Sequence, residues 1–303
     1  MTKRRWKKFL PVYVMALPGL AYLFINNYLP LLGMIIAFKR LDFTKGILGS
    51  PWAGFGNFKY LFATRDAFTI TRNTILYNLA FIVIGTILAI FVAILLNEIR
   101  DKMTSRLFQG VLLIPFLMSM VVVGNLVYAF LSSDTGLINN SILKPLGIPA
   151  ISWYMEGKLW PFILVIVNEW KTIGFTMVIY LSGIVGISSE YYESAKIDGA
   201  SKWKQITNIT IPLLTPTVIT LTLLNIGKIF YSDFGLFYQV TRNSGILYNF
   251  TETIDVYVYN ALMKNGNFAM SSAASVYQSI VGFILIVSAN AAIRKISRNQ
   301  ALF

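Results

Sequence analysis

A charged loop between two long apolar runs holds the residues whose types and spacing point most directly to chemistry, in this case the chemistry of docking. Two carboxylates, Glu193 and Asp198, can each accept charge-assisted hydrogen bonds from Arg or Lys of another protein. Small side chains that permit close backbone approach surround them: Ser194, Ala195, Gly199 and Ala200. Together, these six residues predict a compact, rigid projection that fits a cleft on a partner protein. The alternative is an ordinary polar turn between two apolar segments.

The same loop carries the signals of two short helices. Ser189 can cap the first helix, and Gly199 can end it because glycine accepts a left-handed conformation. Ser201 can cap the second helix. Pro212 and Pro216 then stand at the entrance of the next apolar run, where they predict a kink or a tilt.

The composition limits what else the chain can do. Its 303 residues are 56% hydrophobic and 13% charged, far more apolar than an average soluble domain. It has no Cys and no His, which removes thiol chemistry, the usual general base and the usual metal ligand. The phosphate-binding pattern G-x-x-x-x-G-K-[ST] is also missing from the sequence. We therefore expect a membrane protein that is not an enzyme and binds no cofactor or metal itself.

Six segments are apolar over the roughly 20 residues that a helix needs to cross about 30 Å of hydrocarbon. They are residues 10–38, 73–97, 108–131, 159–188, 208–230 and 268–293. The sequence thus predicts an all-α, polytopic fold with six transmembrane helices in a single domain over residues 1–303. The first segment is too long for a cleavable signal peptide and predicts a helix kinked near Pro30.

The basic residues indicate the orientation of these spans. Lys and Arg are about threefold denser in segments 1–9, 98–107, 189–207 and 294–303 than in 39–72, 132–158 and 231–267, as the positive-inside rule requires. Both termini and the loop 189–207 are therefore predicted to be cytoplasmic, although Lys39 and Arg40 fall on the wrong side. The net charge of +13 is divided among apolar segments, which favours lipid headgroups over nucleic acid as its partner.

Residues 193–212 carry a recognisable pattern: Glu-Ser-Ala, three residues, Gly, nine residues, Ile-x-Ile-Pro. It resembles the EAA loop of permease subunits of ATP-binding-cassette (ABC) importers, which reads Glu-Ala-Ala, three residues, Gly, nine residues, Ile-x-Leu-Pro. Ser194 and Ile211 are conservative departures. In that family the loop forms a coupling helix that sits in a groove of the nucleotide-binding subunit, and closure of two such subunits around ATP switches the permeases between inward-facing and outward-facing states.

Further stretches resemble the branch of that family that imports complex oligosaccharides and polysaccharide fragments. They are residues 17–20, 28–30, 37–39, 46–52, 254–259, 278–283, 290, 294–295 and 301–303. The resemblance implies the type I importer permease fold in the bacterial plasma membrane. It also implies a second homologous permease, two ATP-binding subunits that hold ATP and Mg, and an extracellular solute-binding lipoprotein that delivers an oligosaccharide for transport by alternating access.

Polar residues within the spans are candidates for the cargo path. Charges in a membrane are costly, so Glu169 and Lys171 invite a functional interpretation, although pairing across helices or snorkelling to headgroups would also explain them. Being two apart on a helix, they do not face one another. Amides, hydroxyls and aromatic faces that suit a sugar come from six more residues, for which interhelical hydrogen bonding is the alternative. These are Asn125, Tyr128, Asn168, Asn225, Lys228 and Tyr231.

Three rival functions predict different sequences. An ion-gradient-driven secondary transporter would carry intramembrane acidic residues and an inverted repeat, and only Glu169 fits that description. A membrane-embedded enzyme would need a His, a Cys or paired carboxylates in its spans. An ABC permease for a non-sugar solute, such as an amino acid, a peptide or a metal ion, would share the coupling loop and differ in the cavity.

Overall fold

The computed structural model describes residues 3–296, which are helices, turns and one isolated antiparallel bridge between Lys39 and Trp52. The all-α prediction is confirmed. Residues 301–303, which contributed to the family resemblance, lie outside the described residues. The chain divides into two compact units, one of residues 1–64 and 258–277 and the other of residues 65–257 and 278–303.

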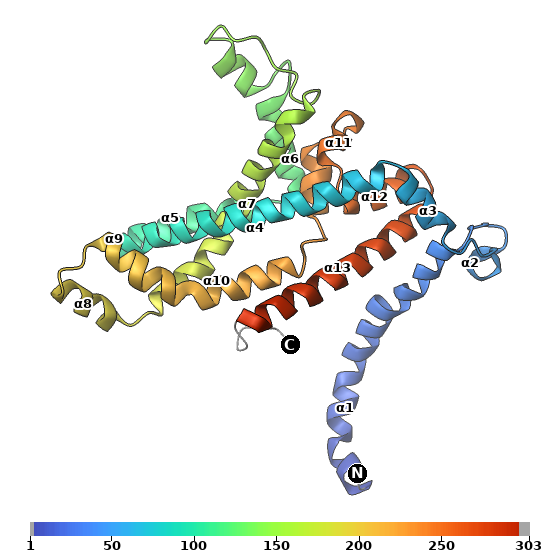
Figure 1. Cartoon of the computed structure of the whole chain (residues 1–303), viewed down its shortest axis with the longest axis horizontal. Helices are drawn as coiled ribbons and strands as arrows, with labels where there is room; N and C mark the ends of the chain where they lie inside the picture. The colour runs from blue at the N-terminus through green and yellow to red at the C-terminus, as the bar shows by residue number, and fades with distance from the viewer. Residues whose placement is uncertain (1–2, 297–303) are drawn as a thin grey trace. The chain divides into compact units, whose positions relative to one another are not determined.

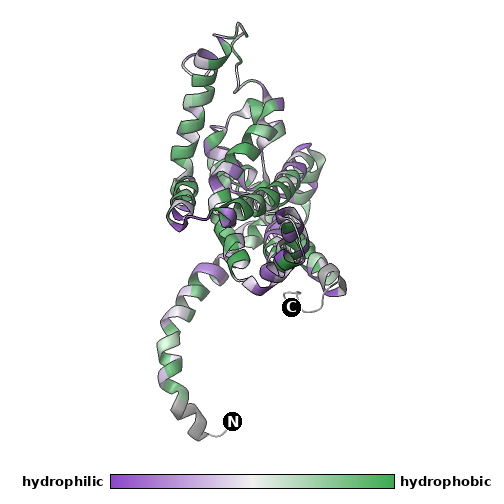
Figure 2. Cartoon of the chain, turned by 90° about the vertical axis from the view of Figure 1, so that its left-hand side faces the viewer, coloured by the Kyte–Doolittle hydropathy of each residue, from purple (hydrophilic) through white to green (hydrophobic). Residues whose placement is uncertain are grey.

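Five helical segments are long and apolar enough to cross a membrane. They are Phe9–Phe38, Asp66–Glu98, Gly157–Val185, Lys202–Ile226 and Phe268–Ala291. The third expected span, 108–131, is broken: Lys102–Leu117 and Met120–Leu131 meet at 95°, and counting this pair as one span gives six. Large apolar side chains remain exposed on these helices, as a lipid environment requires. Figure 2 shows that hydrophobic residues predominate along them.

In the first unit, the N-terminal span changes its helical type along its length. Helix α1, Lys3–Leu23, is followed by a π-helical turn, Phe24–Tyr28, and a 3-10 segment, Leu29–Phe38, with Pro30 in its first turn. Two short helices follow, α2 (Gly46–Gly49) and α3 (Gly56–Ala63). Lys39 is only 3% exposed, and its ammonium donates to the carbonyl oxygens of Ile47 (2.9 Å) and Leu48 (2.7 Å).

The second unit is built around helix α7, which packs against α4 and α5 (Figure 1). One apolar core surrounds Trp160 and Phe237, and another surrounds Met177 and Leu214. The helices of this unit, two of which also contribute residues to the first unit, are α4 (Asp66–Glu98), α5 (Lys102–Leu117), α6 (Met120–Leu131), α7 (Trp160–Val185), α8 (Ser189–Ile197), α9 (Lys202–Gln205), α10 (Ile211–Ile226), α11 (Tyr248–Thr251), α12 (Ile254–Tyr259) and α13 (Phe268–Ile296).

Helix α4 connects the two ends of this unit. At its C-terminal end, Glu98 accepts from the Lys202 ammonium at 2.7 Å. Near its N-terminal end, the Asn73 amide donates to the carbonyl of Glu252 at 2.9 Å. The helix has 33 residues, a length of about 50 Å. The loop 189–207 and the segment 231–257 therefore lie at opposite ends of a helix long enough to cross the bilayer.

Candidate functional site

The loop 189–207 folds as a short exposed helix closed by a tight turn. Ser188 caps α8, because its hydroxyl accepts from the Glu190 amide at 3.4 Å. The expected cap was Ser189, one residue later. At the other end, the amides of Gly199 and Ala200 donate to the carbonyls of Lys196 (3.0 Å) and Ala195 (2.8 Å), which is the Schellman pattern.

Gly199 adopts the left-handed conformation that the sequence predicts. Its φ is +76°, and a Cβ placed there would meet no atom within 4 Å. A side chain would therefore strain the backbone without causing a collision. Ser201 then caps α9, as expected, by accepting from the Lys204 amide at 3.4 Å.

Two hydrogen bonds fix this segment to the membrane helices. The hydroxyls of Tyr192 and Thr210 lie 2.9 Å apart, which ties α8 to the π-helical turn before α10. The buried Gln205 side chain donates to the carbonyl of Ala200 at 2.9 Å. Sequence reasoning missed both anchors because each joins residues from different turns of the chain.

The outward surface of α8 is free to meet another molecule. None of its residues is buried. Glu193 and Asp198 are exposed together with Ser194, and Ile197 is 87% exposed. The exposed Ile and the two carboxylates form a surface that is partly apolar and partly charged, on a helix that is fixed at both ends. Protein interfaces use surfaces of this kind. α8 lies at the same end of this unit as α9 and the start of α10 (Figure 1).

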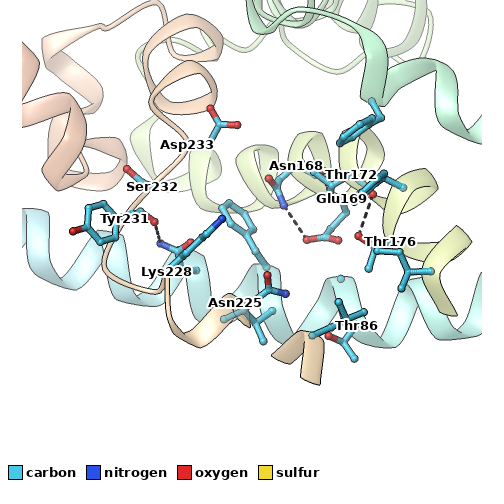
Figure 3. A pocket seen from close by; sticks show the side chains of 18 residues that line it. Thr86, Asn168, Glu169, Thr172, Thr176, Asn225, Lys228, Tyr231, Ser232 and Asp233 are labelled. Atoms are coloured by element: carbon cyan, nitrogen blue, oxygen red, sulfur yellow. Dashed lines mark hydrogen bonds between the residues drawn. The ribbon is translucent and has the colours of Figure 1, made fainter. Parts of the chain in front are cut away.

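A second candidate site is a cavity of about 490 Å³ within the membrane helices of this unit. It lies between α4, α5, α7 and α10, and the segment after α10 closes one side. Five of the eight predicted cargo-path residues line it: Asn168, Glu169, Asn225, Lys228 and Tyr231 (Figure 3). Further polar residues that sequence reasoning did not select complete the lining: Asn78, Thr86, Thr172, Thr176, Ser232 and Asp233.

Glu169 is the most buried charge in this lining. Its side chain is 5% exposed, and Oε1 accepts from the Asn168 amide at 3.2 Å. Within residues 3–296, Oε2 has no hydrogen-bond partner. Gly85 of α4 leaves room for this carboxylate, since a Cβ there would lie 2.8 Å from Oε2.

Lys171 serves a different purpose from its neighbour Glu169. It does not line the cavity; its ammonium donates to the carbonyls of Pro115 (3.3 Å), Phe116 (3.0 Å) and Met118 (2.7 Å). The carbonyls of Phe116 and Met118 are among those that the end of α5 leaves without helical partners, and the Pro115 carbonyl also accepts from the Met118 amide at 3.2 Å. Lys171 therefore supports the break between α5 and α6, and through Phe116 it supports one wall of the cavity.

The break itself follows from local residues and this distant lysine. Pro115 lacks an amide hydrogen, so it weakens the last turn of α5. Ser119 then caps α6 by accepting from the Val122 amide at 3.4 Å. The sequence predicted a span over 108–131 but not the change of direction within it, because hydropathy does not register a change of direction.

Asn125 and Tyr128 lie on α6, beyond the break, and do not line the cavity. Tyr128 instead packs near Tyr154, with ring centroids 5.7 Å apart, and under the Arg242 guanidinium, which lies 4.0 Å from its ring centroid. The Tyr154 hydroxyl donates to the carbonyl of Val240 at 3.2 Å, and burial raises the pKa of Tyr154 to about 12. These contacts join the two segments predicted to be extracellular, 132–158 and 231–267.

Comparison with known proteins agrees with this geometry. LplB of Bacillus subtilis is 31% identical over 292 residues, covering 96% of this chain and 91% of LplB. The polygalacturonan/rhamnogalacturonan transport system permease protein YteP of the same organism is 32% identical over 284 residues, covering 94% of this chain and 88% of YteP. In the crystal structure of a bacterial ABC transporter involved in the import of the acidic polysaccharide alginate, one chain matches with a TM-score of 0.88 and 28% identity, covering 97% of this chain and 98% of that one.

A family model gives the same assignment. The model described as "binding-protein-dependent transport system inner membrane component" matches residues 82–298. This range contains the pattern at residues 193–212 and all the cavity helices except the start of α4. The resemblance to importer permeases is confirmed. The chain belongs to the family of binding-protein-dependent transport system inner membrane components.

Proposed function

We propose that this chain is one membrane subunit of an ATP-driven importer that carries an oligosaccharide across the plasma membrane by alternating access. Membership of a binding-protein-dependent transport family favours this function over an ion-gradient-driven transporter. The cargo class is supported by relatives whose names or descriptions specify polygalacturonan, rhamnogalacturonan and alginate. A non-sugar cargo is the remaining alternative.

The structure of α8 and its attachment to the start of α10 are the main support for the proposed energy coupling. The helix is short, has no buried residue, and is fixed by the Tyr192–Thr210 hydrogen bond of 2.9 Å and by the Schellman turn at Gly199. Force applied to such a helix moves the start of α10 with it, because Thr210 is the last residue before α10 begins. We infer that two separate ATP-binding subunits, which hold ATP and Mg, supply this force.

The remaining partners follow from the two ends of the unit. A second homologous permease supplies the other half of the translocation path, since this chain holds only an open cavity of about 490 Å³. An extracellular solute-binding lipoprotein delivers the sugar at the end formed by segments 132–158 and 231–257. The cavity offers amide, hydroxyl and aromatic groups, which are the groups that bind sugars.

Uptake into proteoliposomes that contain the complete transporter tests the function. We expect accumulation of oligosaccharide that requires ATP and is unaffected by ionophores that collapse proton or sodium gradients. Uptake that persists without ATP and follows an ion gradient would overturn the proposal.

The role of α8 is tested separately with Glu193→Gln and Asp198→Asn, each of which removes one exposed charge. We expect weaker retention of the ATP-binding subunits and lower cargo-stimulated ATP hydrolysis, with unchanged thermal stability of the permease. Glu190→Gln is the matched control, because Glu190 is also exposed on α8 but lies outside the family pattern. Equal effects of all three substitutions would argue against a specific docking role.

A further inference from the structure

The carboxylate of Glu169 is buried in the cavity with one oxygen unused. The side chain is 5% exposed, Oε1 accepts from Asn168, and Oε2 has no partner in the described part of the chain. A buried polar group without a hydrogen bond is costly, and a buried charge costs more. The site is therefore incomplete until a hydrogen-bond donor or a cation arrives.

The helices around Glu169 leave room for its carboxylate at the edge of the cavity. Opposite Glu169, α4 presents Gly85, and the Cβ of any other residue there would lie 2.8 Å from Oε2. The carboxylate borders the cavity of about 490 Å³, a size typical of small-molecule sites. Figure 3 shows Glu169 on the α7 side of this cavity and Lys228 on the side formed by the segment after α10.

The other charges of the lining do not neutralise Glu169. The two ion pairs found among the described residues, Lys45–Asp42 and Lys202–Glu98, both lie outside the cavity. Lys228 is exposed, so water screens much of its charge. Asp233 adds a second carboxylate, with Oδ1 accepting from the Leu236 amide at 3.1 Å. Asp233 is exposed, like Lys228, so Glu169 is the one buried charge among the described residues of the lining.

We propose that Glu169 determines cargo selectivity by accepting hydrogen bonds from hydroxyl or amino groups of a neutral or amino-bearing sugar unit, and by disfavouring a uronate unit at this position. The inference rests on the proposed function and deepens it. An ionised carboxylate only accepts hydrogen bonds. A sugar hydroxyl can therefore donate to Oε2, whereas a second carboxylate adds repulsion and supplies no proton. The proposed preference differs from the acidic polysaccharides that the descriptions of two relatives name, alginate for the structural relative and polygalacturonan/rhamnogalacturonan for YteP.

A cation from the second permease is the competing occupant for Oε2. Such a pair would make Glu169 part of the subunit interface. Its loss would then weaken assembly and leave sugar selectivity unchanged. Retention of the second permease on an affinity-tagged form of this chain distinguishes the two roles.

The test uses the assembled transporter in lipid nanodiscs without its binding protein, so that the membrane subunits alone select. The probes are tri- and tetrasaccharides in matched neutral, hexosamine and uronate forms, and ligand-observed NMR reports the relative affinity for each. The variants are Glu169→Gln, Lys228→Gln and, as a control outside the cavity, the exposed Glu156→Gln.

The wild type is expected to prefer neutral or amino-bearing probes, and Glu169→Gln to raise the uronate-to-neutral affinity ratio by at least about tenfold, given that like charges at an interface cost several kcal/mol. The control should leave the ratio unchanged. A wild-type preference for uronates, or an unchanged ratio in Glu169→Gln, overturns the inference, as does loss of the second permease without a change in ratio.

ATP-dependent uptake of the same probes into proteoliposomes is measured in parallel. No uptake of any probe would count against the proposed function, and the inference would fall with it.

Discussion

The ammonium of Lys171 lies 2.7 Å from the carbonyl oxygen of Met118, the residue that directly follows helix α5. A lysine that is 8% exposed within an apolar span needs a partner, and the partner here is a set of backbone carbonyls instead of a carboxylate. The negative end of the α5 dipole and its unpaired carbonyls provide a suitable environment for the charge.

Lys171→Met should therefore destabilise the permease. It removes the donor to the carbonyls of Phe116 and Met118 and one of the two donors to that of Pro115, and a buried acceptor left unpaired costs about 1–3 kcal/mol. Thermal unfolding of the purified transporter measures the loss. Lys158→Met, at an exposed lysine before α7, is the control. Equal melting temperatures for both variants would contradict the capping role.

Gly174→Ala should separate α5 from α7. A Cβ at Gly174 would collide with the carbonyl oxygen of Leu112, and overpacking of this kind costs about 1–3 kcal/mol. Gly110→Ala on α5 is the matched control because a Cβ there meets nothing within 4 Å. We expect a lower melting temperature for Gly174→Ala only, and no loss of stability in either variant would show that the two helices pack differently.

Gly199→Val should uncouple ATP hydrolysis from uptake. At φ +76° a β-branched side chain strains the turn after α8 by roughly 1–2 kcal/mol, which favours other loop conformations. Gly199→Asn should retain much more activity, because Asn tolerates the left-handed region. The measurement is the ratio of sugar transported to ATP hydrolysed in proteoliposomes. A valine variant with full coupling would count strongly against a rigid docking helix.

The start of α5 should respond to acid. Hydrogen bonds from Thr104, by its hydroxyl and then its amide, and from the Met103 amide hold the pKa of Asp101 below its ordinary value. A depressed folded-state pKa means that the ionised cap stabilises the helix fully above about pH 4 and that this contribution disappears as the pH falls through the folded pKa.

Melting temperatures of the wild type and Asp101→Ala, recorded from pH 7 downward, should thus converge at low pH. Asp101→Asn, a neutral cap, should show a smaller dependence on pH. A constant difference in melting temperature between the wild type and Asp101→Ala at every pH would mean that the charge of Asp101 contributes nothing to stability.

Local signals explain why the docking loop could be predicted closely. The left-handed Gly199 and the Ser201 cap depend on residues within a few positions of each other, so the sequence contains the whole argument. The first cap differed by one residue, Ser188 in place of Ser189, because both serines could serve and the choice depends on where α7 ends.

Long-range contacts explain what the sequence did not reveal. The break after Met118 depends partly on Lys171, which is 53 residues away. Lys39 fell on the wrong side of the charge pattern, and its ammonium is buried on the carbonyls of Ile47 and Leu48 within its own segment.

The cavity was partly predictable. Asn168, Thr172 and Thr176 recur every four residues on α7 and all line the cavity, a spacing that identifies one helix face. Lys171 does not fit this spacing, which is why it faces α5 instead. Glu169 lines the cavity beside Asn168, and the room for its carboxylate depends on Gly85 of α4, a contact that no local pattern predicts.

The two halves of the third span pack against different elements on either side of residue 118. Below the break, α5 is held against α7 through Gly174. Beyond it, α6 is held against the π-helical turn Leu236–Val240, because the Cβ of any residue at Gly124 would lie 2.7 Å from the carbonyl oxygen of Gln239. The α6 half also shares the apolar core around Trp160 and Phe237 with the N-terminal half of α7. Both halves of this span are therefore held by α7 despite the 95° change of direction between them, which makes the break a fixed bend in the fold.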